Sequence, residues 1–155
     1  MEKNIDIRRA KIEDINAIWE IIQELNKNKE EFLSYEDKND NHTKESLLAI
    51  LQPDINTESI WLACVNKRIC GLLDIEYRKA DYLFFNDKYM FIRYLTVQDN
   101  ETEIVEKLMD TAIVDAKKYG FEYICGDMIP EDTYQNELLK KSGLDEYRFR
   151  LSKKL

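Results

Sequence analysis

The sequence predicts a mixed α/β domain in which a mostly antiparallel sheet is flanked by helices. Two kinds of apolar spacing alternate along the chain: steps of two residues indicate strands, and steps of three or four indicate helices. Two strand-like runs in the middle are separated by only three residues, the spacing of an antiparallel hairpin. A long helical run then lies between two further strand-like runs, which indicates a parallel crossover. The expected order of elements is β-α-α-β-β-β-α-β-α-β.

The first third of the chain contains one strand and two helices. Residues 5–9 alternate apolar and polar side chains, as in a half-buried strand. Residues 12–25 form a helix with one apolar face. That face consists of Ile12, Ile15, Ile18, Trp19, Ile22 and Leu25. Residues 43–51 predict a shorter helix, which Thr43 caps and which ends before Pro53, because proline disfavours a helical conformation in its predecessor.

Three strands are predicted in the middle of the chain. Residues 59–65 and 69–77 form the hairpin, and residues 66–68 join them. After a polar connection, residues 89–97 form the next strand. These three strands are expected to lie side by side as a meander.

The C-terminal part contains the most regular helix. Residues 102–119 carry one apolar stripe, and the helix ends at Gly120, a natural left-handed cap. The stripe consists of Ile104, Val105, Leu108, Met109, Ala112, Ile113 and Ala116. Residues 123–126 form a short buried strand, and residues 132–142 form a helix that ends at the following glycine. A last alternating strand is expected at residues 147–151.

Composition and charge limit the class of protein. Apolar residues make up 44% of the chain and charged residues 35%, a globular balance, and no repeat or linker divides it, so residues 1–155 are expected to form one domain. The net charge of −8 disfavours binding to nucleic-acid phosphates. No apolar run reaches the roughly 20 residues of a membrane span, and the N-terminus lacks the apolar stretch of a signal peptide. The expected location is cytoplasmic, with no membrane partner.

Cysteine and histidine usage points away from a metal site. Cys64, Cys70 and Cys125 form no CxxC pair and lie in apolar runs, where a reduced thiol packs as a small apolar group. The only histidine, His42, has no partner pattern for a metal site or a catalytic triad. No metal is therefore expected.

Three segments carry a family likeness. Residues 7–14 (IRRAKIED) are similar to an IRxAxxxD passage from a first strand to a first helix, with Asp14 placed to cap the helix. Residues 61–71 (WLACVNKRICG) match a hairpin of second and third strands, and residues 138–144 (LLKKSGL) match an LYxKxGF segment in which a helix ends at glycine. With the element order, these segments resemble the GCN5-related N-acetyltransferase family across essentially the whole chain.

The resemblance implies transfer of an acetyl group from acetyl-CoA to an amine acceptor, either a small molecule or a peptide. It also implies that backbone groups of the central strand pair with the pantetheine amides. The N-terminus of the long helix would receive the pyrophosphate. The cofactor-binding residues of this sequence would then be Leu95, Thr96, Val97, Asn100, Glu101, Thr102, Glu103 and Ile104.

The loop before the long helix departs from the family pattern. Family members usually carry glycines here, in a motif like Q/RxxGxG/A, whereas residues 98–104 read QDNETEI. Asp99, Glu101 and Glu103 place negative charge where the phosphates would bind, so Coulomb repulsion opposes the cofactor. Two interpretations remain open. The acids complement the helix dipole without a ligand, or the backbone N–H groups still bind the cofactor weakly.

The usual acid and base of the family are replaced as well. Arg93 stands where family strands often carry a glutamate base, and we expect it to pair with Asp74 or Glu76 of the neighbouring strand, or with an acidic substrate. Leu139 stands where the family often has a general-acid tyrosine. The remaining candidates for proton transfer are Tyr94 and Tyr134.

Two functions remain open on this basis. The preserved architecture favours an N-acetyltransferase, because positioning of the reactants alone can lower a barrier by several kcal/mol. The replaced residues favour a catalytically degenerate protein of the same fold that binds a ligand or another protein. With either function, the apolar strand at residues 147–151 could complete the sheet of a second copy and form a homodimer.

Overall fold

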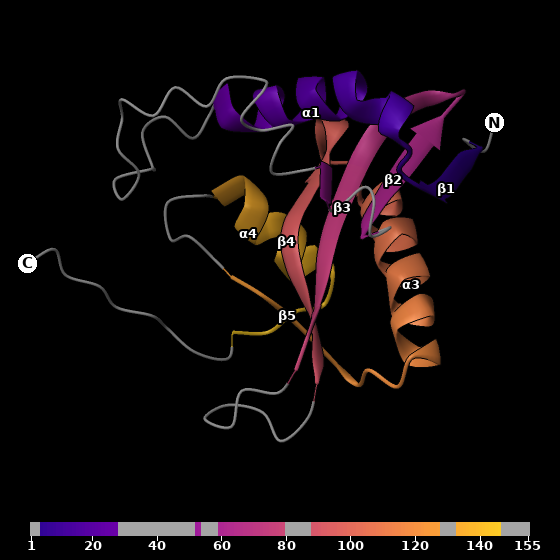
Figure 1. The fold of residues 1–155 in the computed structure, drawn as a ribbon. Coiled ribbons are helices and arrows are strands. Elements are labelled where there is room, and N and C mark those ends of the chain that lie inside the picture. The colour runs from indigo at the N-terminus through magenta and orange to yellow at the C-terminus, as the bar shows by residue number, and fades with distance from the viewer. Residues whose placement is uncertain (1–3, 28–51, 54–58, 80–87, 128–132, 147–155) are drawn as a thin grey trace, which may run out of the picture.

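A computed structural model describes residues 4–27, 52–53, 59–79, 88–127 and 133–146 (Figure 1). Its helices and strands are β1 (Ile5–Arg9), α1 (Ile15–Lys27), β2 (Ile60–Val65), β3 (Arg68–Arg78), β4 (Tyr89–Val97), α3 (Thr102–Lys118), β5 (Tyr123–Gly126) and α4 (Thr133–Lys141). The elements expected at residues 43–51 and 147–151 lie outside the described residues. Gln52 and Pro53 are helical, so the expected stop before Pro53 is wrong. Proline biases its predecessor without barring a helical turn.

The strands form one five-stranded sheet in the order β1-β2-β3-β4-β5. The pairs β1–β2, β2–β3 and β3–β4 are antiparallel. β5 runs parallel to β4, with Tyr89 opposite Tyr123 and Ile92 opposite Gly126. α3 makes the connection between these two parallel strands. The predicted mixed α/β architecture, with one parallel crossover in a mostly antiparallel sheet, is confirmed.

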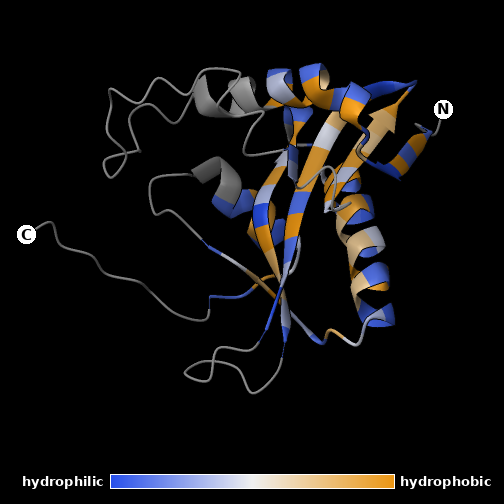
Figure 2. Ribbon diagram, viewed as in Figure 1, coloured by the Kyte–Doolittle hydropathy of each residue, from blue (hydrophilic) through white to orange (hydrophobic). Residues whose placement is uncertain are grey.

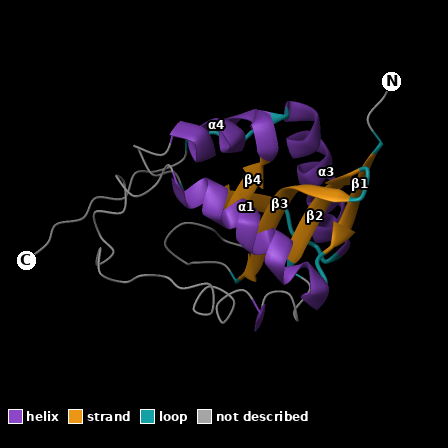
Figure 3. Ribbon diagram, turned by 90° about the horizontal axis from the view of Figure 1, so that it is seen from above, coloured by secondary structure: helices purple, strands orange, loops and turns teal. Residues whose placement is uncertain are grey.

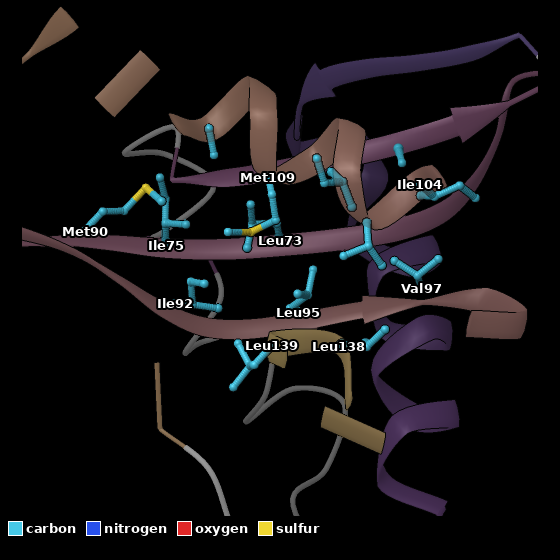
Figure 4. Close-up of a cluster of buried hydrophobic side chains, with 14 of the residues drawn as sticks. Leu73, Ile75, Met90, Ile92, Leu95, Val97, Ile104, Met109, Leu138 and Leu139 are labelled. Atoms are coloured by element: carbon cyan, nitrogen blue, oxygen red, sulfur yellow. The ribbon is translucent and has the colours of Figure 1, made fainter. Parts of the chain in front are cut away.

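Helices cover both faces of the sheet (Figure 3). α1 packs on one face, where Ile18, Ile60, Leu62 and Leu72 belong to a buried cluster. α3 and α4 pack on the other face, where their apolar side chains meet those of β3 and β4 in a larger cluster (Figure 4). Figure 2 shows the apolar side of α3 turned toward the sheet. The predicted stripe of α3 is buried except at Ile113, which is half-buried.

Several turns at the ends of these elements contain residues with a left-handed backbone conformation. Asn66 and Lys67 form the hairpin turn with φ of 51° and 67°. Arg68 already pairs with Val65, so the turn is one residue shorter than expected. Positive φ at both positions is typical of a type I′ turn, whose twist matches that of the flanking strands. Gly120 follows α3 with φ of 75°, which confirms the predicted helix end.

The start of α1 differs from its prediction. Ile12–Asp14 forms a 3₁₀ turn, and Ile12 is 49% exposed. A 3₁₀ turn takes three residues where an α-helix takes 3.6, so Ile12 is rotated away from the apolar face. Asp14 is the third residue of this turn and accepts the N–H of the N-cap Lys11 at 2.7 Å, so it caps from inside the turn and not as the predicted N-cap.

Candidate functional site

The parallel strand β5 pairs with only part of β4. Pairing runs from Tyr89 to Ile92 of β4, and β4 continues to Val97 beyond the last pair with the described part of β5. Figure 1 shows β4 extending upward beyond the level of β5. We call the place where β4 continues past its last described pair with β5 the fork, and residues 93–97 the upper half of β4.

An extra residue in β4 lies at the fork. Ile92 is opposite Ile75 of β3, and Tyr94 is opposite Asp74, so Arg93 has no counterpart in β3. Such a β-bulge bends the strand and increases its twist. The bulge thus lies directly after the last described pair between β4 and β5.

The Arg93 side chain is tied to the neighbouring strands. Its Nη2 donates to Asp74 Oδ1 at 2.7 Å, to the Ile75 carbonyl at 3.2 Å and to Ser59 Oγ at 3.2 Å. The Asp74 side chain is 1% exposed and that of Arg93 is 25% exposed. Of the predicted partners of Arg93, the structure pairs it with Asp74, whereas Glu76 pairs with Arg78. A guanidinium is always protonated in proteins, so Arg93 cannot act as a general base.

The loop from β4 to α3 makes its turn without glycine. Asp99 adopts φ of 56° and ψ of 20°, a left-handed conformation that aspartate enters more readily than most residues. Glu101 is the N-cap of α3, but its side chain makes no capping hydrogen bond. The N–H groups of Thr102 and Glu103 therefore lie at the N-terminus of a 17-residue helix, where an anion is stabilised.

Acidic side chains surround this helix terminus. Asp99 and Glu101 line a pocket of about 410 Å³ between the loop and the β2–β3 hairpin, and Arg68 is the one cation among its lining residues. Glu103 is exposed and pairs with Lys107 at 3.4 Å. Carboxylates at this position complement the helix dipole, and they would also repel a phosphate bound there. Both predicted interpretations of the acids therefore stay open.

The predicted cofactor residues form two groups. The side chains of Leu95, Val97 and Ile104 are at most 1% exposed and belong to the core, so only their backbone could meet a ligand (Figure 4). Thr96 is 6% exposed. The N–H of Ile104 is used within α3, where it donates to the Glu101 carbonyl at 3.1 Å. The loop residues Asn100, Glu101, Thr102 and Glu103 lie together at the start of α3.

The candidates for proton transfer lie on different elements. Tyr94 is on β4 directly after the bulge and is 37% exposed. Tyr134 is on α4, and its side chain lies outside the described residues. Leu139, which replaces the family's tyrosine, is 2% exposed, and a Cβ on Gly126 would lie 3.2 Å from its Cδ2. Leu139 thus packs against the end of β5 and belongs to the hydrophobic core.

The bulge was missed in the sequence, although a signal for it exists. The buried apolar residues of β4 are Met90, Ile92, Leu95 and Val97, so a step of three interrupts the steps of two. Because side chains alternate across a strand, such a step indicates an inserted residue. The role of Ser59 had no comparable signal, because this serine precedes β2 and acts through its hydroxyl group.

Solved structures share the fold of this chain. The aminoglycoside N-acetyltransferase AAC(6')-Iy in complex with CoA has a TM-score of 0.76 at 14% sequence identity, covering 99% of this chain and 97% of that chain. A predicted acetyltransferase from Clostridium acetobutylicum with acetyl-CoA has a TM-score of 0.71 at 16% identity, covering 97% and 96%. The chain has the GCN5-related N-acetyltransferase fold.

A third structure with the GCN5-related N-acetyltransferase fold is an aminoglycoside acetyltransferase from an uncultured soil metagenomic sample, in complex with sisomicin. It has a TM-score of 0.65 at 17% identity, covering 97% of this chain and 96% of that chain. No family model and no curated protein matches the sequence. Among the described helices, none is long and apolar enough to cross a membrane. The same residues contain no group of His, Cys, Asp and Glu side chains that could hold a metal ion.

Proposed function

We propose that this protein is a cytoplasmic, acetyl-CoA-dependent N-acetyltransferase, formed by residues 1–155 as one domain. The observation that carries the proposal is the fork, where β4 continues past the described end of β5 and leads into the N-terminus of α3. A strand edge beyond its neighbour offers backbone groups to the amides of a pantetheine arm. The helix N-terminus beside it offers N–H groups to a diphosphate.

The backbone at the fork fits this cofactor better than the side chains do. The backbone of residues 95–97 would pair with the pantetheine arm, and the N–H groups of Thr102 and Glu103 would receive the phosphates, with Asn100 and Glu101 beside them. Asp99 makes the left-handed turn of this loop without glycine. Each carboxylate about 6 Å from a phosphate costs about 0.7 kcal/mol in water. We therefore propose binding that the acids weaken without preventing it.

The proposed reaction transfers the acetyl group to the acceptor nitrogen. A bond forms between this nitrogen and the carbonyl carbon, the C–S bond of the thioester breaks, the amine loses a proton and the thiolate gains one. Arg93 is committed to Asp74 and supplies no base. Tyr94 and Tyr134 are the proposed proton-transfer residues. The remaining acceleration would come from positioning the acceptor against the thioester.

The proposed acceptor is a small-molecule amine. Two of the similar solved structures are aminoglycoside acetyltransferases, and one of these is in complex with sisomicin. The net charge of −8 attracts cationic amines to this protein. A peptide amine and a homodimer formed through residues 147–151 stay predictions from sequence.

A second candidate function is binding without catalysis. Arg93 forms a structural ion pair where the family often has its base, and Leu139 belongs to the core where the family often has its acid. A protein of this fold could hold a ligand or a partner at the fork and transfer no acetyl group.

Thermal unfolding with acetyl-CoA and with free CoA tests the proposal. A ligand at about 100 times its dissociation constant stabilises the folded state by about 2.7 kcal/mol. For a chain of this length, that corresponds to a rise in Tm of roughly 5–10 °C. We expect such a rise, followed by release of free thiol when acetyl-CoA is supplied with a suitable amine. No rise with either ligand at millimolar concentration would refute the cofactor site. A rise without thiol release from any amine would favour the binding module.

A further inference from the structure

We propose that the ion pair between Arg93 and Asp74 positions the fork. It holds the bulge of β4 and thereby sets the course of the upper half of this strand beyond its last pair with β5. The link to the cofactor rests on the proposed function, whereas the effect on the bulge does not.

Three features coincide at Arg93. It is the extra residue of β4, it directly follows the last described pair with β5, and it lies opposite the break in the register of β3. That break falls between Asp74 and Ile75. The guanidinium donates to the side chain of Asp74 and to the carbonyl of Ile75, so it bonds to both sides of the break. Arg93 thus bridges the bulge that its own backbone creates.

Ser59 extends this bridge to a third strand. Its O–H donates to Asp74 Oδ1 at 3.3 Å, and its Oγ accepts from Arg93 at 3.2 Å. Its carbonyl accepts the N–H of Ile75 at 3.3 Å. Because Ser59 directly precedes β2, the network ties β2, β3 and β4 together at the level of the fork.

Stability alone does not account for a buried pair at this position. Ile92 and Leu95 flank the bulge and pack into the large cluster with α3 and α4, so apolar packing already contributes to the register. A buried carboxylate requires a matched partner, and apolar side chains of similar size stabilise a protein as well or better. The pair bonds to both sides of the register break, so we infer that it fixes the backbone geometry of β4 at the bulge more than it adds to stability.

Two double variants distinguish an effect on the backbone geometry of β4 from an effect on the overall stability of the protein. Arg93→Met/Asp74→Leu replaces the pair at the fork with apolar side chains. Arg8→Met/Asp14→Leu is the matched control, because it removes an ion pair of the same 2.7 Å length between β1 and the start of α1. For each variant and the wild type, we would measure amide hydrogen exchange of residues 93–97 relative to β2, and the dissociation constant for free CoA.

We expect exchange of residues 93–97 to be about tenfold faster in Arg93→Met/Asp74→Leu than in the wild type, and CoA binding to be about tenfold weaker. The control should change neither quantity. Arg93→Lys keeps the positive charge but lacks the guanidinium group, so its exchange rate and its dissociation constant for CoA should lie between those of the wild type and the double variant. This single variant replaces the double variant if the double variant does not fold. Exchange at the wild-type rate in both Arg93 variants would overturn the proposal. Failure of the wild type to bind CoA would instead count against the proposed function, and the exchange result would still decide the role of the pair.

Discussion

Asp14 joins β1 to the start of α1 through charged hydrogen bonds. Its carboxylate accepts Arg8 Nη1 and Nη2 at 2.7 and 2.8 Å, and the N–H of Lys11 at 2.7 Å. The bonds from Arg8 hold the pKa of Asp14 below its usual value, although burial acts in the opposite direction. Folding lowers this pKa, so Asp14 stabilises the fold fully above about pH 3.9, the value in an unfolded chain. The stabilisation is lost as the pH falls through the lower folded pKa.

Asp14→Asn is expected to lower the free energy of unfolding by about 1–3 kcal/mol at neutral pH, because charged hydrogen bonds to Arg8 are lost. At about pH 2, which is below the pKa of about 3.9 in the unfolded chain, the difference from the wild type should shrink, since protonation of the carboxyl then favours the unfolded state. Urea unfolding of both proteins at the two pH values measures this. Asp110→Asn, at an exposed position on α3, is the control and should have little effect at either pH. A difference that does not depend on pH would contradict this role of Asp14.

Glu103 carries a removable charge at the proposed phosphate site. Glu103→Gln is expected to strengthen CoA binding about threefold, because one charge at about 6 Å in water is worth about 0.7 kcal/mol. Glu106→Gln, an exposed position one turn later on the same helix, removes the same charge farther from the terminus and should have a smaller effect. Titration calorimetry of the two variants measures both constants. Equal effects would mean that the phosphates do not lie at the start of α3.

At the scale of elements, the β2–β3 hairpin contains a residue in an unfavourable conformation. Lys67 is exposed and has φ of 67° in a turn that favours glycine at this position. Lys67→Gly should raise the free energy of unfolding by about 1 kcal/mol, because glycine adopts positive φ without steric cost. Lys117→Gly, in the exposed part of α3, should lower it by about the same amount. Urea unfolding would detect both shifts, and destabilisation by Lys67→Gly would argue against this turn.

The elements that the sequence predicted are those with strong periodic signals. The stripe of α3 and the stop at Gly120 were correct because each apolar position repeats the same helical face. Ile12 was assigned to the face of α1 incorrectly, because periodicity alone does not distinguish a 3₁₀ turn from the first turn of an α-helix. Local patterns thus predicted where elements lie better than how they begin.

The candidate site was less predictable than the fold. The ion pair of Arg93 with Asp74 followed from opposite charges on neighbouring strands, and it was predicted. The bulge at Arg93 and the hydrogen bonds of Ser59 depend on the register of three strands, which no single segment of the sequence encodes. The left-handed conformation of Asp99 was also missed, because aspartate is compatible with several loop conformations.

At the scale of the whole molecule, one sheet separates two apolar clusters. The smaller cluster lies under α1, and the larger lies under α3 and α4. Neighbouring residues of β3 contribute to different clusters, since Leu72 belongs to the first and Leu73 to the second. Both clusters are therefore built on the same strands, and loss of either one would expose one face of these strands to water. We expect the two faces of the sheet to unfold together.

Two tryptophans can report on the two faces separately. Trp19 lies on α1, and Trp61 packs against the cluster under α3. Trp61→Phe leaves Trp19 as the probe, and Trp19→Phe leaves Trp61. In each of these backgrounds we expect a single urea transition. Ile18 is a residue of α1 and is 0% exposed. Adding Ile18→Ala should lower the free energy of unfolding by about 2–5 kcal/mol.

The position of Ile18 makes this a test of cooperativity. If the described elements unfold as one unit, Trp61 on the far face will report the same loss of stability from Ile18→Ala as Trp19 does. If the α1 face unfolds independently, only the transition seen by Trp19 will move, and Trp61 will keep its wild-type midpoint. Val114→Ala, which is on the exposed side of α3 at 56% exposure, should leave both transitions nearly unchanged. Equal shifts from the two probes would mean that the proposed cofactor site at the fork depends on the packing of α1 across the sheet.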